Sequence, residues 1–382
     1  MTTVKMVKLG TLIKPAKLQK CGNDDYPVLS MTMHNGLVFQ SDKFKKSVAS
    51  QDKSTYKVVH RNQLVIGFPI DEGVLATQRI TDAGIVSPAY GIWDVDQTKI
   101  IPEFLEYALR CNRAIDYYKA KLRGSTARRR SLPTPTLLEL DVPLPDIEQQ
   151  RLALTTIRHA KNALDNRQAQ LTKLDELIKA RFVEMFGDPV TNPFNWPTVE
   201  LGQRCEIITG NTPSRAEPEN YGTFIEWIKS DNINTPSTFL TPAQEYLSEV
   251  GFQKCRFVES GSLLMTCIAG SLNCIGNVAV TNRRVAFNQQ INAITPTCDN
   301  VLYLYWLMIL SKPAIHKTIN MALKGILSKS QLSSIKFPFP SIECQNQFAA
   351  FVAEVDKSKV EVQKALDQTQ LLFDSLMQQY FG

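Results

Sequence analysis

A long stretch of this chain occurs twice, and the duplication constrains the fold more than any other feature. Residues 146–187 return as residues 341–382 at a constant offset of 195 residues, and the match needs no gap. Chance is a poor explanation for a match of this length, so we expect one duplicated long helix. Identical residues gather at both ends of the stretch: Ile147, Glu148, Gln150, Phe186 and Gly187 return as Ile342, Glu343, Gln345, Phe381 and Gly382.

Apolar residues in both copies recur at heptad spacing, which is typical of helices that pair along one face. Lys359 interrupts this spacing in the second copy. A helix of roughly 40 residues would be a rod of about 60 Å, and the average helix has only about 11–12 residues. We therefore expect the two copies to pack against each other; two ordinary core helices are the alternative. The expected pairing residues are Ile157, Leu164, Leu171, Ile178 and Met185 in the first copy and Val352, Val355, Leu366, Phe373 and Tyr380 in the second.

Both copies carry helix-boundary signals at their ends. Asp146 and Ser341 stand at the starts, where a side-chain oxygen can accept from the first free N–H groups of a helix. Gly187 followed by Asp188–Pro189 ends the first copy, because glycine takes the left-handed turn and proline cannot continue a helix. The boundaries predict four parts: a globular domain over residues 1–145 (head 1), a helix over 146–187, a second globular domain over 188–340 (head 2) and a helix over 341–382.

The two heads show a weak repeat of their own. Val7–Gly10 resembles Val199–Gly202, and short apolar runs that follow turn residues predict strands in both heads. Each head then has an aromatic-rich helical stretch, at Ile101–Cys111 and Val301–Leu310. The predicted fold is therefore α+β, with two similar α/β heads, two long pairing helices and an internal two-fold repeat.

The composition limits the class of protein. The chain has 382 residues, more than one hydrophobic core usually serves, and a net charge of +6. Its eight cysteines include no C-x-x-C pair, which favours reduced thiols over disulfides or a zinc site. The longest apolar run, Val301–Leu310, is too short to span a membrane, and the N-terminus lacks the apolar core of a signal peptide. We expect a soluble, cytoplasmic protein that does not associate with membranes.

The common enzyme motifs are missing from the sequence. There is no phosphate-binding loop, no dinucleotide fingerprint and no Gly-x-Ser-x-Gly elbow. The four histidines are not spaced to share a metal ion. We therefore expect no catalytic residue, no metal site and no cofactor in this chain.

A basic stretch in head 1 is the clearest candidate for contact with a polyanion. Six of the twelve residues from Lys119 to Arg130 are basic. Several fixed cations displace the counterions of DNA together, so such a loop suits phosphate contacts. A solvated, highly charged loop is the alternative. The candidates in this stretch are Lys119, Lys121, Arg123, Ser125, Thr126, Arg128, Arg129 and Arg130.

Other polar segments of both heads carry side chains that can read base edges. Asn, Gln and Arg form paired hydrogen bonds with bases, although Asn and Ser also fill ordinary turns. In head 1 the candidates are Met31, His34, Asn35, Arg61 and Arg79. In head 2 they are Asn211, Thr212, Arg215, Lys229, Ser230, Asn232, Arg283, Arg284, Asn288, Gln289, Lys324 and Lys329.

Three segments resemble the specificity (S) subunit of type I restriction–modification systems. They are the helix entry Pro143–Gln150, the helix exit Arg181–Pro189 and the segment Asn288–Asn292, and the resemblance extends over essentially the whole chain. It implies two target-recognition domains separated by two antiparallel long helices. Each domain would read one half of a split DNA site, and the helices would fix the gap. The stretch Gly124–Val142 is longer than Gly325–Phe337, which leaves the placement of the basic loop open.

The resemblance also implies partners. The S subunit itself has no active site; it binds double-stranded DNA and two modification subunits, which carry S-adenosylmethionine and methylate adenine. Restriction subunits, which use ATP and Mg²⁺, translocate and cut the DNA. Two other readings stay open: a protein-binding scaffold without DNA specificity, and an enzyme with degenerate motifs.

Overall fold

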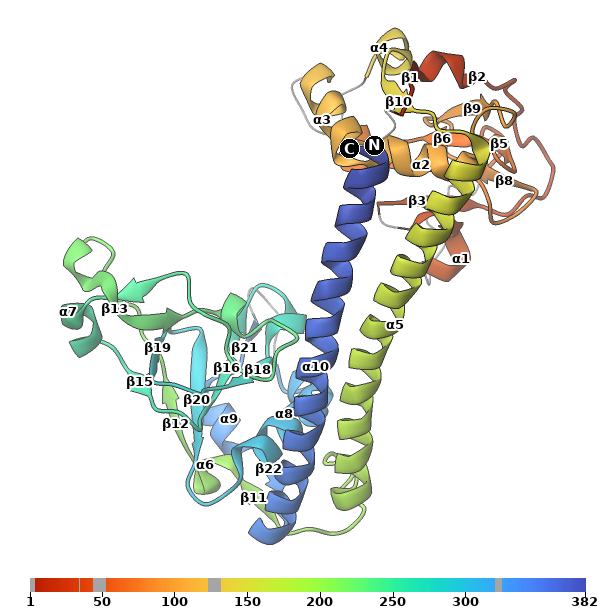
Figure 1. Cartoon of the computed structure of the whole chain (residues 1–382). Coiled ribbons are helices and arrows are strands. Elements are labelled where there is room, and N and C mark those ends of the chain that lie inside the picture. Colours follow the sequence, from red (N-terminus) through yellow and green to blue (C-terminus); the bar gives the residue numbers. More distant parts are fainter. Residues whose placement is uncertain (1–3, 34, 44–52, 123–131, 320–324) are drawn as a thin grey trace. The chain divides into compact units, whose positions relative to one another are not determined.

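A computed structural model describes residues 4–33, 35–43, 53–122, 132–319 and 325–382 of the chain. It divides into two compact units, one formed by Met1–Gln168 with Lys364–Gly382 and the other by Ala169–Gln363. The divisions fall inside the two long helices. Each unit therefore holds one head together with part of each long helix (Figure 1).

The two long helices predicted from the repeat are confirmed. Helix α5 spans Ile147–Phe186 and helix α10 spans Ile342–Phe381, 40 residues each. The Asp146 Oδ1 atom accepts from the Gln149 N–H at 2.8 Å, as expected for a helix cap. Gly187 ends α5 with a φ of +77°, a left-handed conformation that glycine adopts without steric cost.

Within each unit, parts of α5 and α10 pack together in an antiparallel arrangement. In the first unit the start of α5 shares a core with the end of α10, and in the second unit the end of α5 shares a core with the start of α10. The core contacts come from Leu154, Ile157, Phe373, Tyr380 and Phe381 in the first unit and from Ile178, Phe182, Phe186, Phe348, Val352 and Val355 in the second.

The pairing face is apolar near the heads and more polar elsewhere. Ile157, Ile178, Val352 and Val355 are buried. Lys359, which interrupts the heptads, lies with its Nζ atom 2.7 Å from an Asp175 carboxylate oxygen. The remaining predicted pairing residues are half-buried: Leu164, Leu171, Met185, Leu366, Phe373 and Tyr380.

Head 1 is built from short strands that are followed by helices. Its first and last strands pair antiparallel, with Val7 opposite Val142, so the chain leaves the head where it entered. The paired strands are β1 (Met6–Lys8) with β10 (Asp141–Pro143), β3 (Leu29–Thr32) with β4 (Gly36–Phe39) and β5 (Lys57–His60) with β8 (Ala83–Val86); a four-stranded sheet has the order β2 (Ile13–Pro15), β9 (Gly91–Val95), β6 (Leu64–Ile66), β7 (Leu75–Thr77). The helices are α1 (Gln40–Lys43), α2 (Pro102–Arg110), α3 (Asn112–Lys121) and α4 (Thr134–Leu138).

Head 2 repeats this plan with more strands. Its first and last strands again pair antiparallel, with Val199 opposite Phe337. Two pairs of strands are β11 (Thr198–Glu200) with β22 (Lys336–Pro338) and β17 (Ile268–Ala269) with β21 (Gly325–Ile326). One four-stranded sheet has the order β12 (Cys205–Thr209), β20 (Ile291–Pro296), β16 (Leu263–Thr266), β18 (Val278–Val280). The other four-stranded sheet has the order β14 (Tyr246–Leu247), β13 (Tyr221–Ile228), β19 (Val285–Phe287), β15 (Phe257–Val258). The helices are α6 (Leu201–Arg204), α7 (Glu249–Gln253), α8 (Val301–His316) and α9 (Lys329–Ser334).

A repeated glutamine joins each long helix to its head. Gln150 and Gln345 are both 0% exposed. The Gln150 side-chain oxygen accepts from the Ile101 N–H at 2.8 Å, and the Gln345 oxygen accepts from the Asn300 N–H at 2.8 Å. Ile101 and Asn300 are the residues just before α2 and α8. The same connection is therefore made in both halves of the repeat, which fits the predicted α+β fold.

Among the described residues, none of the helices combines the length and the apolar character that a membrane span requires.

Candidate nucleic-acid interface

The structure brings three of the predicted base-reading residues of head 1 near one another. The Arg61 Nη1 atom donates to the Arg79 carbonyl at 2.9 Å, and the Arg61 guanidinium also pairs with Asp82. Asn35 and Arg79 line the same cavity, which has a volume of about 660 Å³. Met31 lies half-buried on β3, the strand that leads into the turn containing Asn35. Asn35, Arg61 and Arg79 thus belong to one edge of the head, and the cavity at this edge is also lined by residues of α5 and α10.

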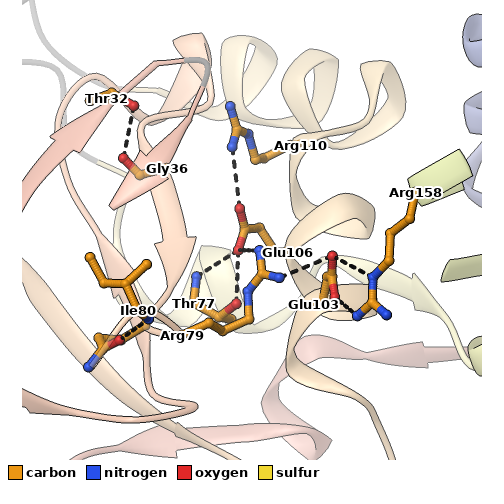
Figure 2. Close-up of polar contacts among 10 residues, drawn as sticks. Thr32, Gly36, Thr77, Arg79, Ile80, Glu103, Glu106, Arg110 and Arg158 are labelled. Atoms are coloured by element: carbon orange, nitrogen blue, oxygen red, sulfur yellow. Dashed lines mark hydrogen bonds and ion pairs between the residues drawn. The ribbon is translucent and has the colours of Figure 1, made fainter. Parts of the chain in front are cut away.

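A buried carboxylate on α2 lies beneath this edge. The Glu106 side chain is 10% exposed. It accepts from the Thr77 N–H at 2.9 Å, from the Thr77 hydroxyl at 2.8 Å and from the Arg79 guanidinium at 3.4 Å. It also accepts from Arg110 at 3.4 Å, and Arg110 donates to the Met33 carbonyl. Figure 2 shows Thr77, Arg79 and Arg110 around the Glu106 carboxylate, which therefore joins two turns of the head.

A second carboxylate, one helical turn earlier, extends the network to the long helix. Glu103 lies 3.0 Å from the Arg79 guanidinium and also pairs with Arg158 of α5 (Figure 2). Burial opposes ionisation of Glu103, but Arg158 and Arg79 together hold its pKa below the usual value. The carboxylate therefore stays charged at neutral pH. Two carboxylates hold three guanidinium groups, which leaves the cluster with one excess positive charge.

Head 2 has a comparable group around Trp227. Arg215 lies 2.8 Å from the Glu245 carboxylate, and Lys229 pairs with the same carboxylate. The Arg215 guanidinium lies 4.9 Å from the Tyr221 ring centroid, and the Lys229 ammonium lies 5.3 Å from the Trp227 centroid. The Lys229 hydrogen bond is the main reason that the pKa of Glu245 lies below its usual value, with Arg215 contributing further. One charged carboxylate again fixes two cations.

The loop before Arg215 is held in place by its own amide side chains. Asn211 donates to the Lys254 carbonyl at 2.8 Å and accepts from the Arg256 N–H at 2.8 Å. The Thr212 hydroxyl donates to the Gln289 side chain. These contacts bring three predicted residues (Asn211, Thr212 and Gln289) next to the group around Trp227.

Other candidates of head 2 form bonds within the head. The Asn232 side chain accepts from the Lys229 N–H at 3.1 Å and donates to the Pro242 carbonyl at 3.0 Å, and Ser230 is half-buried beside it. The buried Asn288 side chain accepts from the Gln290 N–H at 3.1 Å. Asn232 and Asn288 therefore shape turns, and contact of these residues with DNA stays a prediction.

Arg283 and Arg284 both pair with carboxylates. The Arg283 guanidinium binds Glu226, with Nη2 and Oε1 2.9 Å apart, and donates to two backbone carbonyls. The Arg284 guanidinium pairs with Glu259 and lies 5.4 Å from the Phe257 ring centroid. Arg284 is the more exposed of the two, at 56% of its side chain against 32% for Arg283. Of this pair, Arg284 is therefore better placed for a phosphate.

The basic stretch of head 1 is described only in part. Lys119 and Lys121 lie exposed in the last turn of α3, and Lys329 lies exposed at the start of α9. Eight candidates lie outside the described residues: His34, Arg123, Ser125, Thr126, Arg128, Arg129, Arg130 and Lys324.

The carboxylates that organise both groups were not among the predicted site residues. On α2, Glu103, Glu106 and Arg110 follow one another at spacings of three and four residues, which places them on one helix face. That spacing was available in the sequence. Glu245 had no comparable signal, because its partners come from other segments of the chain. Arg158 was likewise hidden among the exposed charges of a long helix.

Comparisons with known proteins agree with the resemblance inferred from the helix entries and exits. Residues 193–369 match the family described as the type I restriction modification DNA specificity domain. The chain is 28% identical over 188 residues to the HindI specificity subunit of Haemophilus influenzae. The aligned stretch covers 47% of this chain and 40% of that protein. It is also 28% identical over 177 residues to the MjaIX specificity subunit of Methanocaldococcus jannaschii, and this aligned stretch covers 43% of this chain and 38% of that protein. These matches thus span about two fifths of each relative's length.

Solved structures extend the likeness of fold to the whole chain. A chain from a structure on complex assembly and conformational transition of the type I R-M system superposes with a TM-score of 0.60 at 16% identity, covering 99% of this chain and 97% of that chain. The type I S subunit from M. genitalium superposes with a TM-score of 0.57 at 14% identity, covering 100% and 97%. The predicted resemblance to S subunits is confirmed.

Proposed function

We propose that this chain, as a member of the S-subunit family, is the DNA specificity subunit of a type I restriction–modification complex. It would select the sequence without catalysing a reaction. The observation that carries the proposal is the pair of polar groups, one in each head, in which carboxylates fix exposed cations beside amide side chains. Such groups suit a nucleic acid, because cations contact phosphates and Arg, Asn and Gln recognise base edges.

Each head would read one half of a bipartite DNA site. The heads share a chain path but differ in their polar groups, so they are suited to two different half-sites. A homodimer places two identical readers on a palindrome. One fused chain with two dissimilar heads can instead read a non-palindromic site.

The long helices would set the gap between the half-sites and bind the methyltransferase subunits. Leu177 and Leu372 occupy the same position in the two copies of the repeat, and they are 48% and 53% exposed. The other identical pairs named above lie at the helix ends. A repeated exposed leucine supports the binding of two copies of one partner. We propose that these are the modification subunits with S-adenosylmethionine, joined in the cytoplasm by restriction subunits that use ATP and Mg²⁺.

A selection from randomised double-stranded DNA tests this function directly. The chain is assembled with its modification subunits, and the bound DNA is sequenced. We expect one bipartite sequence and an affinity that falls steeply as salt rises. Methylation of adenine within that sequence, together with no transfer of methyl groups by the chain alone, would complete the assignment. Recovery of unrelated sequences would contradict it.

A scaffold that binds only proteins is the second candidate, and the exposed leucines of the long helices favour it. Such a scaffold would join the partner subunits without any salt-dependent affinity for DNA. The same selection separates the two functions, because a scaffold enriches no sequence.

A further inference from the structure

We propose that Glu106 and Glu245 are positioning residues for sequence discrimination, each for the half-site read by its own head. The inference rests on the proposed function, which supplies the two half-sites. Neither carboxylate is proposed to contact DNA. Each acts through the cations that it holds.

In head 1 the Glu106 carboxylate links two turns through its hydrogen bonds. It accepts from Thr77, the last residue of β7, from Arg79 in the turn that follows, and from Arg110 (Figure 2). Arg110 in turn donates to the Met33 carbonyl in the turn between β3 and β4. Gly36, with a φ of +63°, packs so closely that an added Cβ atom would lie 3.3 Å from a Glu106 carboxylate oxygen. Both turns therefore rest on the same carboxylate, and both carry candidates for DNA contact.

In head 2 Glu245 does the same for two other segments. Its carboxylate receives Arg215 from the loop after β12 and Lys229 from the end of β13. Its own carbonyl accepts from the Trp227 N–H at 3.0 Å, which fixes the backbone of Glu245 against that strand. The Tyr221 and Trp227 rings then limit the directions that the two cations can take.

A fixed cation and a free cation act differently on DNA. A guanidinium held in one direction can discriminate between bases, because paired hydrogen bonds demand a defined geometry. A free guanidinium still attracts phosphates, which carry no sequence information. Loss of the carboxylate should therefore reduce discrimination without reducing general affinity.

The test compares Glu106→Gln with Glu245→Gln in the chain assembled with its modification subunits. Affinity is measured for the selected DNA and for DNAs in which one half-site or the other is scrambled. Discrimination at a half-site is the ratio of the affinity for the selected DNA to the affinity for DNA with that half-site scrambled. We expect each variant to lower this ratio about tenfold at one half-site, as the loss of one good base contact would. The two variants should affect different halves. Affinity for fully scrambled DNA should be equal or higher, because a negative charge is removed.

Two matched controls change the charge by the same amount elsewhere in each head. Asp96→Asn removes the partner of Lys99 in head 1, and Glu206→Gln replaces an exposed carboxylate on β12 in head 2. Neither carboxylate belongs to the two polar groups. We expect discrimination at both half-sites to stay within twofold of the unmodified chain.

Substitution of the cations provides a second test if Glu106→Gln or Glu245→Gln fails to fold. Arg79→Gln and Arg215→Gln replace side chains that are 40% and 59% exposed. When Arg79 is replaced, Glu103 keeps Arg158 and Glu106 keeps Arg110 as a partner. We expect the same half-specific loss, now with weaker general affinity.

Three results would overturn the proposal: equal losses at both half-sites, loss of general affinity with discrimination intact, or full discrimination in both arginine variants. Absence of any bipartite preference in the unmodified complex would instead contradict the proposed function.

Discussion

At the scale of single residues, the repeat retains groups whose contacts are the same in both halves. Gln150 and Gln345 are fully buried and bond the chain just before α2 and α8. Phe186 and Phe381 are buried at the ends of the long helices, where they pack against Tyr303 of α8 and Phe104 of α2. The identities that revealed the duplication are therefore largely explained by the junctions between helix and head.

Removal of one of these glutamines should destabilise its junction. In Gln345→Ala, the Asn300 N–H and the Pro340 carbonyl lose their partner, and Asp299 loses a donor. A buried group left without a partner costs about 1–3 kcal/mol. We expect a loss of this size in the free energy of unfolding, measured with urea. Gln347→Ala, at an exposed position two residues further on, should change it by less than about 0.5 kcal/mol; equal losses would contradict this role.

At the scale of elements, the long helices are held chiefly by their ends. Phe182, Phe186, Tyr303 and Phe348 form one aromatic cluster in the second unit, with centroids 5.0–5.6 Å apart. The face between the apolar ends is interrupted by charge, as at Lys359 and Asp175.

Truncation in the aromatic cluster should be severe. Phe182 is 0% exposed, and replacement of a buried phenylalanine by alanine typically costs about 3–5 kcal/mol. We expect Phe182→Ala to lower the free energy of unfolding of the second unit by that amount in urea. The neighbouring Val183 is 44% exposed, so Val183→Ala should cost no more than about 0.5 kcal/mol. A similar loss in both variants would show that the cluster does not hold the helix.

The charged residues between the long helices, which include Asp356 beside Lys359, predict that stability depends on pH. Burial raises the pKa of Asp356; Lys359 opposes the rise, and Asp175 adds to it. A carboxyl whose folded pKa exceeds its unfolded value destabilises the protein once the pH passes the unfolded value of about 3.9. We therefore expect Asp356→Asn to raise the melting temperature at neutral pH, with the gain disappearing as the pH falls below about 4. A gain of equal size at low pH would contradict the assigned cause.

The sequence allowed the two long helices and their pairing to be predicted, because a period repeated over many residues resists local exceptions. Their antiparallel direction came only from the family resemblance. The strands of the heads were predictable only as approximate positions, since most have two to five residues. The carboxylate of Glu245 was not predicted, because its partners come from segments distant in the chain. Glu106 left a signal, the spacing of Glu103, Glu106 and Arg110 on one face of α2, which was not used. Several predicted base readers, such as Asn232 and Asn288, bond within turns, a use that composition cannot separate from DNA contact.

At the scale of the whole molecule, we propose that one repeated pair of helices joins two heads that read different half-sites. Duplication explains why both heads close with the same antiparallel strand pair before each long helix begins. It also explains why the junctions are retained while the polar groups differ. Specificity would then change by altering a head, whereas the gap between half-sites would change only with the helices.

A deletion of one heptad from each long helix tests this central claim most directly. Residues 162–168 and 357–363 occupy equivalent positions in the repeat, and removal of seven residues preserves the heptad spacing. Each helix shortens by about 10 Å, which corresponds to about three base pairs of DNA. In the selection from randomised DNA, we expect unchanged half-sites with a gap altered by about that number. The same gap, or new half-sites, would contradict the account.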